Sequence, residues 1–375
     1  MAARRSAVVV GAGVFGASLA YTLVWRDWDV TLVEARAPGH ARASSGGESR
    51  LLRYAHGADR WHTRLAWRAR TLWRELEQRT GTELFVPAGT AWFAHRHDGW
   101  EADSEATMAA ERIPVRRLGT AEAAALFPDL ATGDLSFVLF EPEGGVLRAA
   151  AAVRALVDAT LSAGGRLVPG EARPDGAAVD VDGRGLRADR VVWACGPWLP
   201  RLFPGLVDLR VTKQDVLFFG APPAWRTPPV PTWVDYDGAA YGLGDLDGHG
   251  VKACPDVEGE EFDPEDGRRE LSPVNERRAR DYLRLRFPSL ADAPLLGART
   301  CQYTLTADTH FVVAPHPHDP SVWLLGGGSG HGFKHGPALG EYVAELLAGE
   351  REPDPRFALG HRDRGAGLRT AGGVT

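Results

Sequence analysis

Short apolar runs and glycine-rich turns alternate over the first residues of the chain. Residues 7–10 form an uninterrupted run of alanine and valine, which is typical of a buried parallel strand. A glycine-rich turn follows, and residues 17–25 have the composition of an apolar helix. Residues 29–34 then predict a second strand that ends on a carboxylate. The order of strand, glycine turn, helix and strand predicts a Rossmann-type α/β domain.

Helical periodicity returns several times further along the chain. From residue 61 to residue 80 apolar side chains recur at helical spacing, and Gly81 is a suitable residue to end that helix. Further helices are predicted at 149–163, 275–287 and 337–349.

Apolar runs and turn residues predict the remaining strands. Residues 190–194 and 322–325 are runs of buried-strand type, and each leads into glycine. A short hairpin-like region is expected after the helix at 149–163, and residues 211–255 are rich in strand-forming residues. The segment from about residue 361 is rich in glycine and arginine, and we expect it to fray.

Composition narrows the class of protein. Hydrophobic residues are 44% and charged residues 25% of the chain, which excludes a disordered or collagen-like protein. At about 150 residues per domain, 375 residues predict two or three domains. The net charge of −6 and the scattered basic residues argue against a basic surface that binds nucleic acid. No apolar stretch reaches the roughly 18 residues of a membrane span, and none resembles a signal peptide, so we expect a cytoplasmic protein.

Cysteine and lysine are both scarce. The three cysteines form no Cys-x-x-Cys pair, which argues against a zinc ribbon or a disulfide framework, and no other metal-ligand spacing is visible. Of 43 basic residues only Lys213, Lys252 and Lys334 are lysine, and the other forty are arginine. Because the pKa of lysine can be moved and that of arginine cannot, each lysine is a candidate for chemistry.

The glycine turn has the spacing of a dinucleotide site. Gly11 allows the tight turn, Gly13 lets the backbone approach a pyrophosphate, and Gly16 allows close packing of helix on strand. The helix N-terminus offers N–H groups to phosphate, and Glu34 is placed to accept hydrogen bonds from a ribose diol. NAD and FAD both fit this pattern, whereas Glu34 disfavours NADP. A glycine turn without a ligand is the alternative.

Several further segments carry a family resemblance. They are Ser49-Arg50-Leu51-Leu52-Arg53, Tyr241-Gly242 with Lys252 eleven positions later, Cys301-Gln302-Tyr303-Thr304, Asp308-Thr309-His310-Phe311 and Gly328-Ser329-Gly330-His331-Gly332-Phe333-Lys334. In order and spacing, from about residue 6 to about residue 350, the chain resembles the monomeric sarcosine oxidase and N-methyltryptophan oxidase family of D-amino-acid-oxidase-like flavoproteins.

The resemblance implies an α/β fold in which a Rossmann-type FAD-binding domain is interleaved with an α+β catalytic domain built on a mostly antiparallel sheet. The FAD-binding domain is expected to comprise residues 1–85, 148–210 and 308–375. The catalytic domain is expected to comprise residues 86–147 and 211–307.

The same resemblance assigns the cofactor. It implies that FAD is held covalently through an 8α-thioether to Cys301, while Cys195 and Cys254 are expected to be small core residues. The residues expected to contact FAD are Gly11, Gly13, Val14, Phe15, Gly16, Glu34, Ala35, Ser45, Ser49, Arg50, Ala172, Gly196, Trp198, Cys301, Gly328, Gly330, His331, Gly332 and Lys334.

The resemblance also assigns the reacting groups. Lys252 matches the lysine that activates oxygen, and Arg50 is expected beside the flavin. Arg53 and Lys334 are expected to hold a substrate carboxylate. Because Arg50 and Arg53 are three positions apart, we expect both on one side of a turn. The other expected pocket residues are the catalytic Tyr241 and Asp256 and the substrate-binding Tyr303 and His56.

Departures from the family bear on the substrate. Asp256 stands where sarcosine oxidases have histidine, and it resembles the acid of the piperideine-carboxylate oxidase of nikkomycin biosynthesis. A solvated loop acid is the alternative for Asp256. Two histidines of the family are replaced by Ser45 and Gly46, and a tyrosine is replaced by His56. These changes favour a bulkier or cyclic secondary amino acid over sarcosine.

The predicted activity is FAD-dependent oxidation of the C–N bond of an amino acid to an imine, with O2 reduced to H2O2. The substrate is predicted to be a secondary, N-methyl or cyclic amino acid. Alternatives are a desaturating oxidase of cyclic imino acids, a primary amino-acid oxidase, an NAD-dependent dehydrogenase and a non-catalytic flavin-binding protein. The partners expected are the small-molecule substrate and O2, without nucleic acid or membrane, and the protein is predicted to be a monomer.

Overall fold

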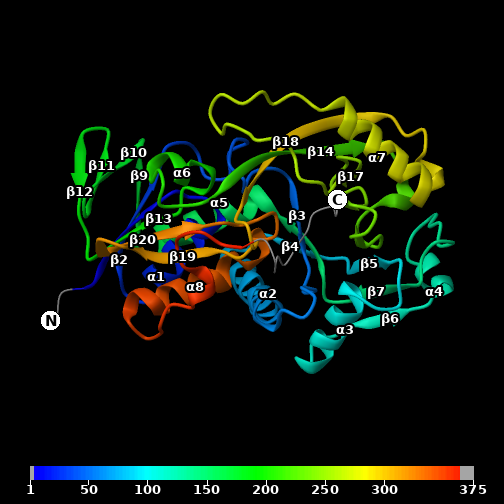
Figure 1. Cartoon of the computed structure of the whole chain (residues 1–375), viewed down its shortest axis with the longest axis horizontal. Helices are drawn as coiled ribbons and strands as arrows, with labels where there is room; N and C mark the ends of the chain where they lie inside the picture. Colours follow the sequence, from blue (N-terminus) through cyan, green and yellow to red (C-terminus); the bar gives the residue numbers. More distant parts are fainter. Residues whose placement is uncertain (1–3, 364–375) are drawn as a thin grey trace.

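The computed structural model describes residues 4–363 (Figure 1). Two large sheets dominate it, and Figure 1 shows them at opposite ends of the long axis of the molecule. Most of the segment from residue 361 that was expected to fray lies outside the described residues. Among the described helices, none is both long and apolar enough to cross a membrane.

The first large sheet has six strands, all parallel except the edge strand β19. In spatial order they are β19 (Val312–His316), β20 (Asp319–Gly326), β13 (Arg190–Trp193), β1 (Ser6–Val10), β2 (Asp29–Glu34) and β9 (Arg166–Pro169). Every residue of β1 after Ser6 is buried, because helices cover one face of the sheet and a small β-meander covers the other.

The meander is the hairpin-like region expected from the sequence. It is an antiparallel sheet of three strands, β10 (Ala172–Asp175), β11 (Ala178–Val181) and β12 (Arg184–Leu186). Valines of β11 pack with those of β1 and β13 in one apolar cluster.

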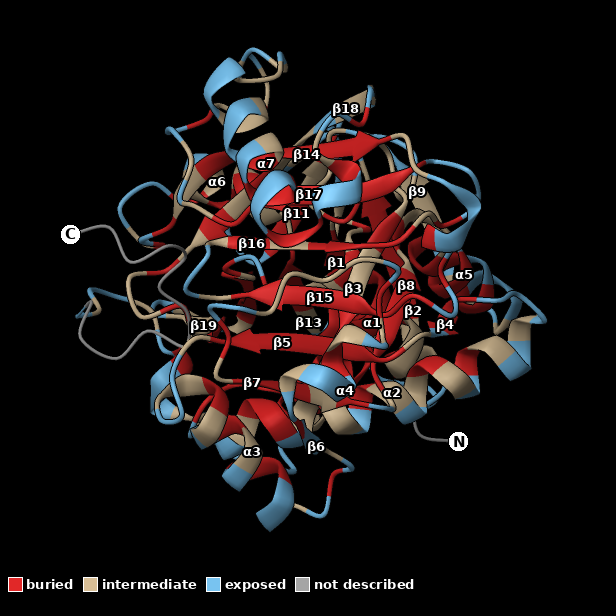
Figure 2. Cartoon of the chain, turned by 90° about the vertical axis from the view of Figure 1, so that its right-hand side faces the viewer, coloured by how far each residue is buried: buried red, intermediate tan, exposed pale blue. Residues whose placement is uncertain are grey.

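The second large sheet has eight strands, and only the β15–β5 pair is parallel. In order they are β18 (Leu295–Leu305), β14 (Arg210–Phe219), β17 (Val251–Pro255), β16 (Ala240–Leu243), β15 (Thr232–Asp235), β5 (Thr90–Ala94), β7 (Phe137–Glu141) and β6 (Arg116–Leu118). Figure 2 shows these strands as a largely buried layer. The mostly antiparallel catalytic sheet expected from the resemblance is therefore confirmed.

A third sheet joins the two regions. It contains β3 (Ser49–Leu52), β8 (Gly145–Arg148) and β4 (Phe85–Pro87), all antiparallel. Both β4 and β8 cross a boundary of the proposed domain division, at residues 85/86 and 147/148, so the division itself stays a proposal. The segment expected as a turn around Arg50 is strand β3, because β8 supplies a pairing partner that the local sequence does not show.

Over the described residues, the structure has the five helices expected from the sequence, within a few residues, and three that were not expected, at 100–110, 120–124 and 199–202. They are α1 (Val14–Val24), α2 (Arg60–Thr80), α3 (Trp100–Ala110), α4 (Thr120–Ala124), α5 (Ala149–Ser162), α6 (Leu199–Leu202), α7 (Pro273–Arg286) and α8 (Gly336–Ala348). Short 3-10 turns are η1 (Gly196–Trp198), η2 (Pro223–Trp225), η3 (Pro288–Leu290), η4 (Phe333–His335) and η5 (Pro355–Phe357). Helix α1 begins three residues earlier than expected because Gly13 serves as its N-cap.

Candidate active site

A cavity of about 510 Å³ lies where β1 ends in the glycine turn. Gly11 has a φ of +99°, and a Cβ atom there would lie 2.6 Å from the carbonyl oxygen of Ala194. A Cβ on Gly16 would lie 1.9 Å from the carbonyl oxygen of Gly11. Both positions therefore require glycine, the first for conformation and the second for the close approach of α1 to the turn.

Most of the predicted cofactor residues line this cavity, although they come from distant parts of the chain. They are Gly11, Gly13, Val14, Phe15, Glu34, Ala35, Ser45, Arg50, Ala172, Gly196, Trp198, Cys301, Gly328, Gly330 and Gly332. Four other residues expected at the cofactor do not line it, namely Gly16, Ser49, His331 and Lys334.

Two side chains hold the glycine turn in place. The carboxylate of Glu34 accepts hydrogen bonds from the backbone N–H groups of Ala12, at 2.7 Å, and Arg36, at 2.9 Å. Burial raises the pKa of Glu34, and these two N–H groups oppose the rise. Ser45 Oγ accepts from the backbone N–H of Val14 at 2.9 Å. Glu34 thus reaches the cavity wall as predicted, and it also braces the turn.

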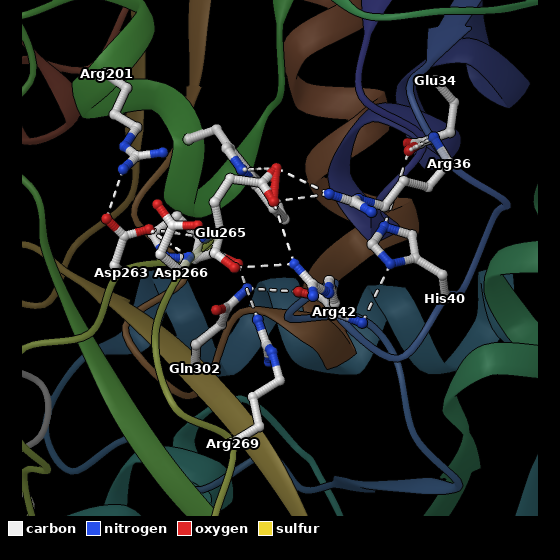
Figure 3. Close-up of polar contacts among 12 residues, drawn as sticks. Glu34, Arg36, His40, Arg42, Arg201, Asp263, Glu265, Asp266, Arg269 and Gln302 are labelled. Carbon is white, nitrogen blue, oxygen red and sulfur yellow. Dashed lines mark hydrogen bonds and ion pairs between the residues drawn. The ribbon is translucent and has the colours of Figure 1, made fainter.

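An acidic loop at residues 263–266 contributes Glu265 to the cavity lining (Figure 3). It was not predicted from the sequence. Glu265 accepts hydrogen bonds from Arg36 at 2.9 and 2.7 Å, from Arg42 at 3.3 Å and from the Trp198 indole at 3.3 Å. Asp263, two residues earlier, pairs with Arg201 at 2.5 Å. These pairs join residues far apart in the chain, so spacing could not reveal them.

Cys301 lies on β18 with its sulfur at the cavity wall. The Arg50 guanidinium approaches it, with Nη2 3.4 Å from Sγ. The same nitrogen donates to the backbone carbonyls of Ser44, at 2.8 Å, and Gly46, at 2.9 Å. Arg50 is thereby fixed beside the sulfur.

A second cavity, of about 600 Å³, shares Arg50 and Cys301 with the first and is also lined by Lys252 and Ser49. Lys252 is only 2% exposed. Its Nζ lies 3.4 Å from the carbonyl oxygen of Ser49 and 5.4 Å from the centre of the Tyr241 ring. Burial lowers the pKa of Lys252 below its ordinary value, and burial raises the pKa of Tyr241 well above its own.

Arg53 and Lys334 form a separate cationic region, in which Lys334 is buried and Arg53 is partly buried. Nζ of Lys334 donates to the carbonyl oxygen of His331 at 2.9 Å. Burial, reinforced by the charge of Arg53, lowers the pKa of Lys334 well below its ordinary value. Arg53 donates to the carbonyl oxygen of Ala55 at 3.0 Å and lies 4.8 Å from the centre of the Trp92 ring.

The expectation that Arg50 and Arg53 share one side of a turn is wrong. Arg50 is in a strand and Arg53 follows it, and side chains three positions apart in an extended chain point to opposite sides. Arg50 accordingly reaches Cys301, and Arg53 reaches Trp92. The two arginines can therefore act on different groups.

Asp256 and Tyr303 are both buried. Asp256 is 4% exposed, which excludes the solvated loop acid considered from the sequence. Its backbone N–H donates to the carbonyl oxygen of Ala239 at 2.6 Å. Tyr303 lines the 510 Å³ cavity and interacts with Tyr241, and burial raises its pKa.

His56 and the two other cysteines also lie inside the protein. His56 is 3% exposed and its Nδ1 is 2.8 Å from the carbonyl oxygen of Tyr54. Cys254 is a core residue at 1% exposure, as expected. Cys195 instead lines the 510 Å³ cavity, because β13 ends beside β1 at the glycine turn.

The cavity has the features of a dinucleotide site. Glycines keep side chains away from the backbone N–H groups at the start of α1, and a buried carboxylate lies at the end of β2. Together with a mostly antiparallel second sheet, this defines a nucleotide-dependent oxidoreductase of the flavoprotein type. The chain belongs to the family described as FAD dependent oxidoreductase (DAO), whose model matches residues 6–346.

Characterised proteins align along nearly the whole chain. A monomeric sarcosine oxidase of Bacillus sp. (strain B-0618) is 29% identical over 94% of this chain and 95% of its own. The peroxisomal sarcosine oxidase of Homo sapiens is 28% identical over 92% and 93%. The solved structure of NikD, described as an unusual amino acid oxidase essential for nikkomycin biosynthesis, has a TM-score of 0.78 at 23% identity and covers 94% of this chain and 97% of its own.

Proposed function

We propose that this protein oxidises the C–N bond of a secondary amino acid to an imine and passes the electrons to O2, producing H2O2. The observation that carries the proposal is a pair of cations, the buried Lys334 and the partly buried Arg53, in a protein of the FAD dependent oxidoreductase family. Buried positive charge without water is favourable when it binds an anion, and the carboxylate of an amino acid is such an anion. The names of the sarcosine oxidase relatives support the same substrate class.

FAD, when bound, supplies the electron acceptor for the C–N bond. The residues that would hold it are those around the 510 Å³ cavity, with the N–H groups of the glycine turn facing the pyrophosphate. We also propose that Cys301 is the point of covalent attachment. Its support is the Cys-x-Tyr-Thr motif together with the position of Cys301 in the lining of the 510 Å³ cavity, beside the guanidinium of Arg50.

The protein residues divide into two groups by task. Arg53 and Lys334 would hold the substrate carboxylate, while Tyr303 and Tyr241 would enclose the amine. Lys252 lines the second cavity together with Arg50 and Cys301. Its ammonium would there stabilise the negative charge that develops as oxygen is reduced. Contacts that become stronger as charge develops accelerate a reaction, whereas uniform binding does not.

A cyclic secondary amino acid is the preferred substrate within this class, and its desaturation is the second candidate reaction. The burial of Asp256 favours it, because a carboxyl group beside the amine can exchange a proton or bind a substrate N–H. Ser45 and Gly46 also stand where the family has histidines, so two imidazole rings are missing and leave more space. The primary amino-acid oxidase is the third candidate. The cytoplasmic location and the monomeric state stay proposals, and the name of the Bacillus relative supports the second.

An anaerobic bleaching screen tests the activity. The purified yellow protein is mixed without oxygen with primary, N-methyl and cyclic amino acids, each paired with its decarboxylated analogue. We expect loss of flavin absorbance with secondary amino acids and little with the analogues. Mass spectrometry of the products separates amine plus carbonyl compound from a desaturated ring. Bleaching by none of the acids, or equal bleaching by the analogues, contradicts the proposal.

A further inference from the structure

Five histidines that are scattered in the sequence gather beneath the glycine-rich loop before α8. His56 follows β3, His62 is in α2, His310 precedes β19, and His331 and His335 flank Lys334. Ring centres are 5.1 Å apart for His56 and His335, 5.9 Å for His56 and His331, and 5.8 Å for His331 and His335. The sequence predicted no metal site, because these residues share no ligand spacing.

His56, His331 and His335, called the inner triad here, have the geometry of a ligand set. One ring nitrogen of each lies within 4.8 Å of one ring nitrogen of each of the others. All three side chains are buried, at 3%, 5% and 0% exposure.

Hydrogen bonds to the backbone orient two of these rings. Nδ1 of His56 is 2.8 Å from the carbonyl oxygen of Tyr54, and Nε2 of His331 is 2.9 Å from that of Thr309. A carbonyl can only accept, so these two nitrogens carry the hydrogen, and His56 Nε2 and His331 Nδ1 keep a lone pair. Metal-binding histidines are typically held in this way, with the second ring N–H on a carbonyl.

The remaining nitrogens of the inner triad lack partners. Within residues 4–363, His56 Nε2, His331 Nδ1 and both ring nitrogens of His335 are buried and make no hydrogen bond. Such groups are rare in folded proteins, and an ion or an internal water is the usual reason for them. Three converging imidazoles suit borderline divalent ions. We propose that the inner triad binds one divalent first-row transition-metal ion, with Zn²⁺ as the reference ion.

The charges around the inner triad permit this binding. The three imidazoles are buried, and each keeps at least one ring nitrogen without a hydrogen-bond partner among the described residues. Lys334 and Arg53 are the nearby cations. The buried carboxylate of Glu141 offsets part of their positive charge.

A second group of possible ligands lies beside the inner triad. Asp59, His62 and His310 have ligand atoms within 4.8 Å of one another, and Asp59 and His310 are only partly buried. The His62 ring lies 5.3 Å from that of His310 and 5.5 Å from that of His331. Under the proposal, the ion enters the protein by way of this outer group.

Direct binding measurements test the proposal without turnover. The untagged holoenzyme is stripped with a chelator, equilibrated with Zn²⁺ and dialysed, and its zinc content is measured. We expect about one zinc per chain, with a thermal midpoint that rises with zinc concentration. With Cu²⁺ in place of Zn²⁺, electron paramagnetic resonance should show splitting from three ring nitrogens, which requires no variant.

Three variants test where the ion binds. His335→Phe should lose the zinc, whereas His97→Phe, which alters an exposed histidine outside the cluster, should keep it. His310→Phe should slow loading and leave the final zinc content unchanged. The proposal is overturned by wild-type protein that takes up no zinc, by copper without nitrogen splitting, or by zinc that survives His335→Phe and disappears in His310→Phe. Because none of these readouts needs an amine substrate, their failure is separate from failure of the proposed oxidation.

Discussion

Lys252 and Lys334 are both 2% exposed, yet their surroundings differ. Lys252 is the second residue of β17, in the eight-stranded sheet, and it lines the 600 Å³ cavity. Lys334 is in the short turn η4 and lines neither of the two cavities described above, with Arg53 and imidazoles as neighbours. Burial lowers the pKa of both lysines and a neighbouring arginine adds to the effect in each, Arg50 for Lys252 and Arg53 for Lys334. Equal burial thus leaves one lysine beside open space and the other in a packed cationic region.

This difference supports the proposal that the two lysines act in different half-reactions. A cation beside a cavity that reaches the cofactor wall can meet a small molecule such as O2. Burying a cation in a packed region costs desolvation free energy, and binding a carboxylate offsets that cost. The predictions below either remove the cofactor that both regions need or separate the two lysines from each other.

The largest expected effect is loss of the cofactor in Gly11→Ala. The added methyl group would lie 2.6 Å from the carbonyl oxygen of Ala194, at a backbone conformation that alanine rarely adopts. We expect protein that purifies without flavin absorbance, so that neither half-reaction is measurable. The control is Gly133→Ala, where an added Cβ meets nothing within 4 Å. Normal flavin content in Gly11→Ala would show that the glycine turn is not part of the cofactor site.

The next effect is complete loss of covalent attachment in Cys301→Ser. Acid precipitation of the wild-type protein should leave the flavin absorbance in the pellet, and peptide mass spectrometry should place it on Cys301. In Cys301→Ser the flavin should appear in the supernatant, because a serine hydroxyl cannot form the thioether. Cys254→Ser, which alters a buried cysteine elsewhere, should keep the flavin in the pellet. A colourless wild-type pellet from flavin-loaded protein contradicts covalent attachment and leaves noncovalent FAD binding possible.

Replacing Lys334 by Met should weaken carboxylate binding. Removing one partner of a buried charged hydrogen bond costs about 2–5 kcal/mol, which is roughly 30- to 4,000-fold in affinity. The measurement is the dissociation constant of a simple alkanoate, from the perturbation of the flavin spectrum. Lys252→Met serves as the matched control and should change this constant much less. Equal losses in both variants would remove the distinction between the two regions.

The pH dependence of the same binding should identify Lys334. Its charged form binds the carboxylate, and its lowered pKa means that this charge is lost as pH rises through a value well below 10.5. Alkanoate affinity should therefore fall with rising pH in the wild type and in Lys252→Met. The fall should be missing in Lys334→Met. A wild-type affinity that stays constant up to pH 10 would show that Lys334 does not bind the carboxylate as an ammonium.

Local sequence predicted the six-stranded region well and the buried cationic region poorly. The glycine turn, Glu34 and the helix after them are contiguous, so spacing alone predicted how they lie. In contrast, the pairing of β3 with β8 converted an expected turn around Arg50 into a strand, and only distant residues determine that pairing.

Long-range contacts account for the other features that the sequence did not reveal. Glu265 meets Arg36 across more than two hundred residues, and His56 meets His335 across an even longer separation. The family resemblance identified Lys252, Cys301 and Lys334 as important. It did not show that Lys252 faces the second cavity, or that Asp256 is buried rather than solvated.

The most direct test of the two-region account is a stopped-flow comparison of Lys252→Met and Lys334→Met with a reactive substrate. Flavin reduction is followed without oxygen, and reoxidation is followed by mixing the reduced protein with O2. Loss of one preorganised electrostatic group should slow reoxidation in Lys252→Met by about 10²–10³-fold and leave reduction nearly unchanged. Lys334→Met should show the reverse, with weakened substrate binding in the reductive step and normal reoxidation. Equal losses of both steps in both variants, or normal reoxidation in Lys252→Met, would contradict the account.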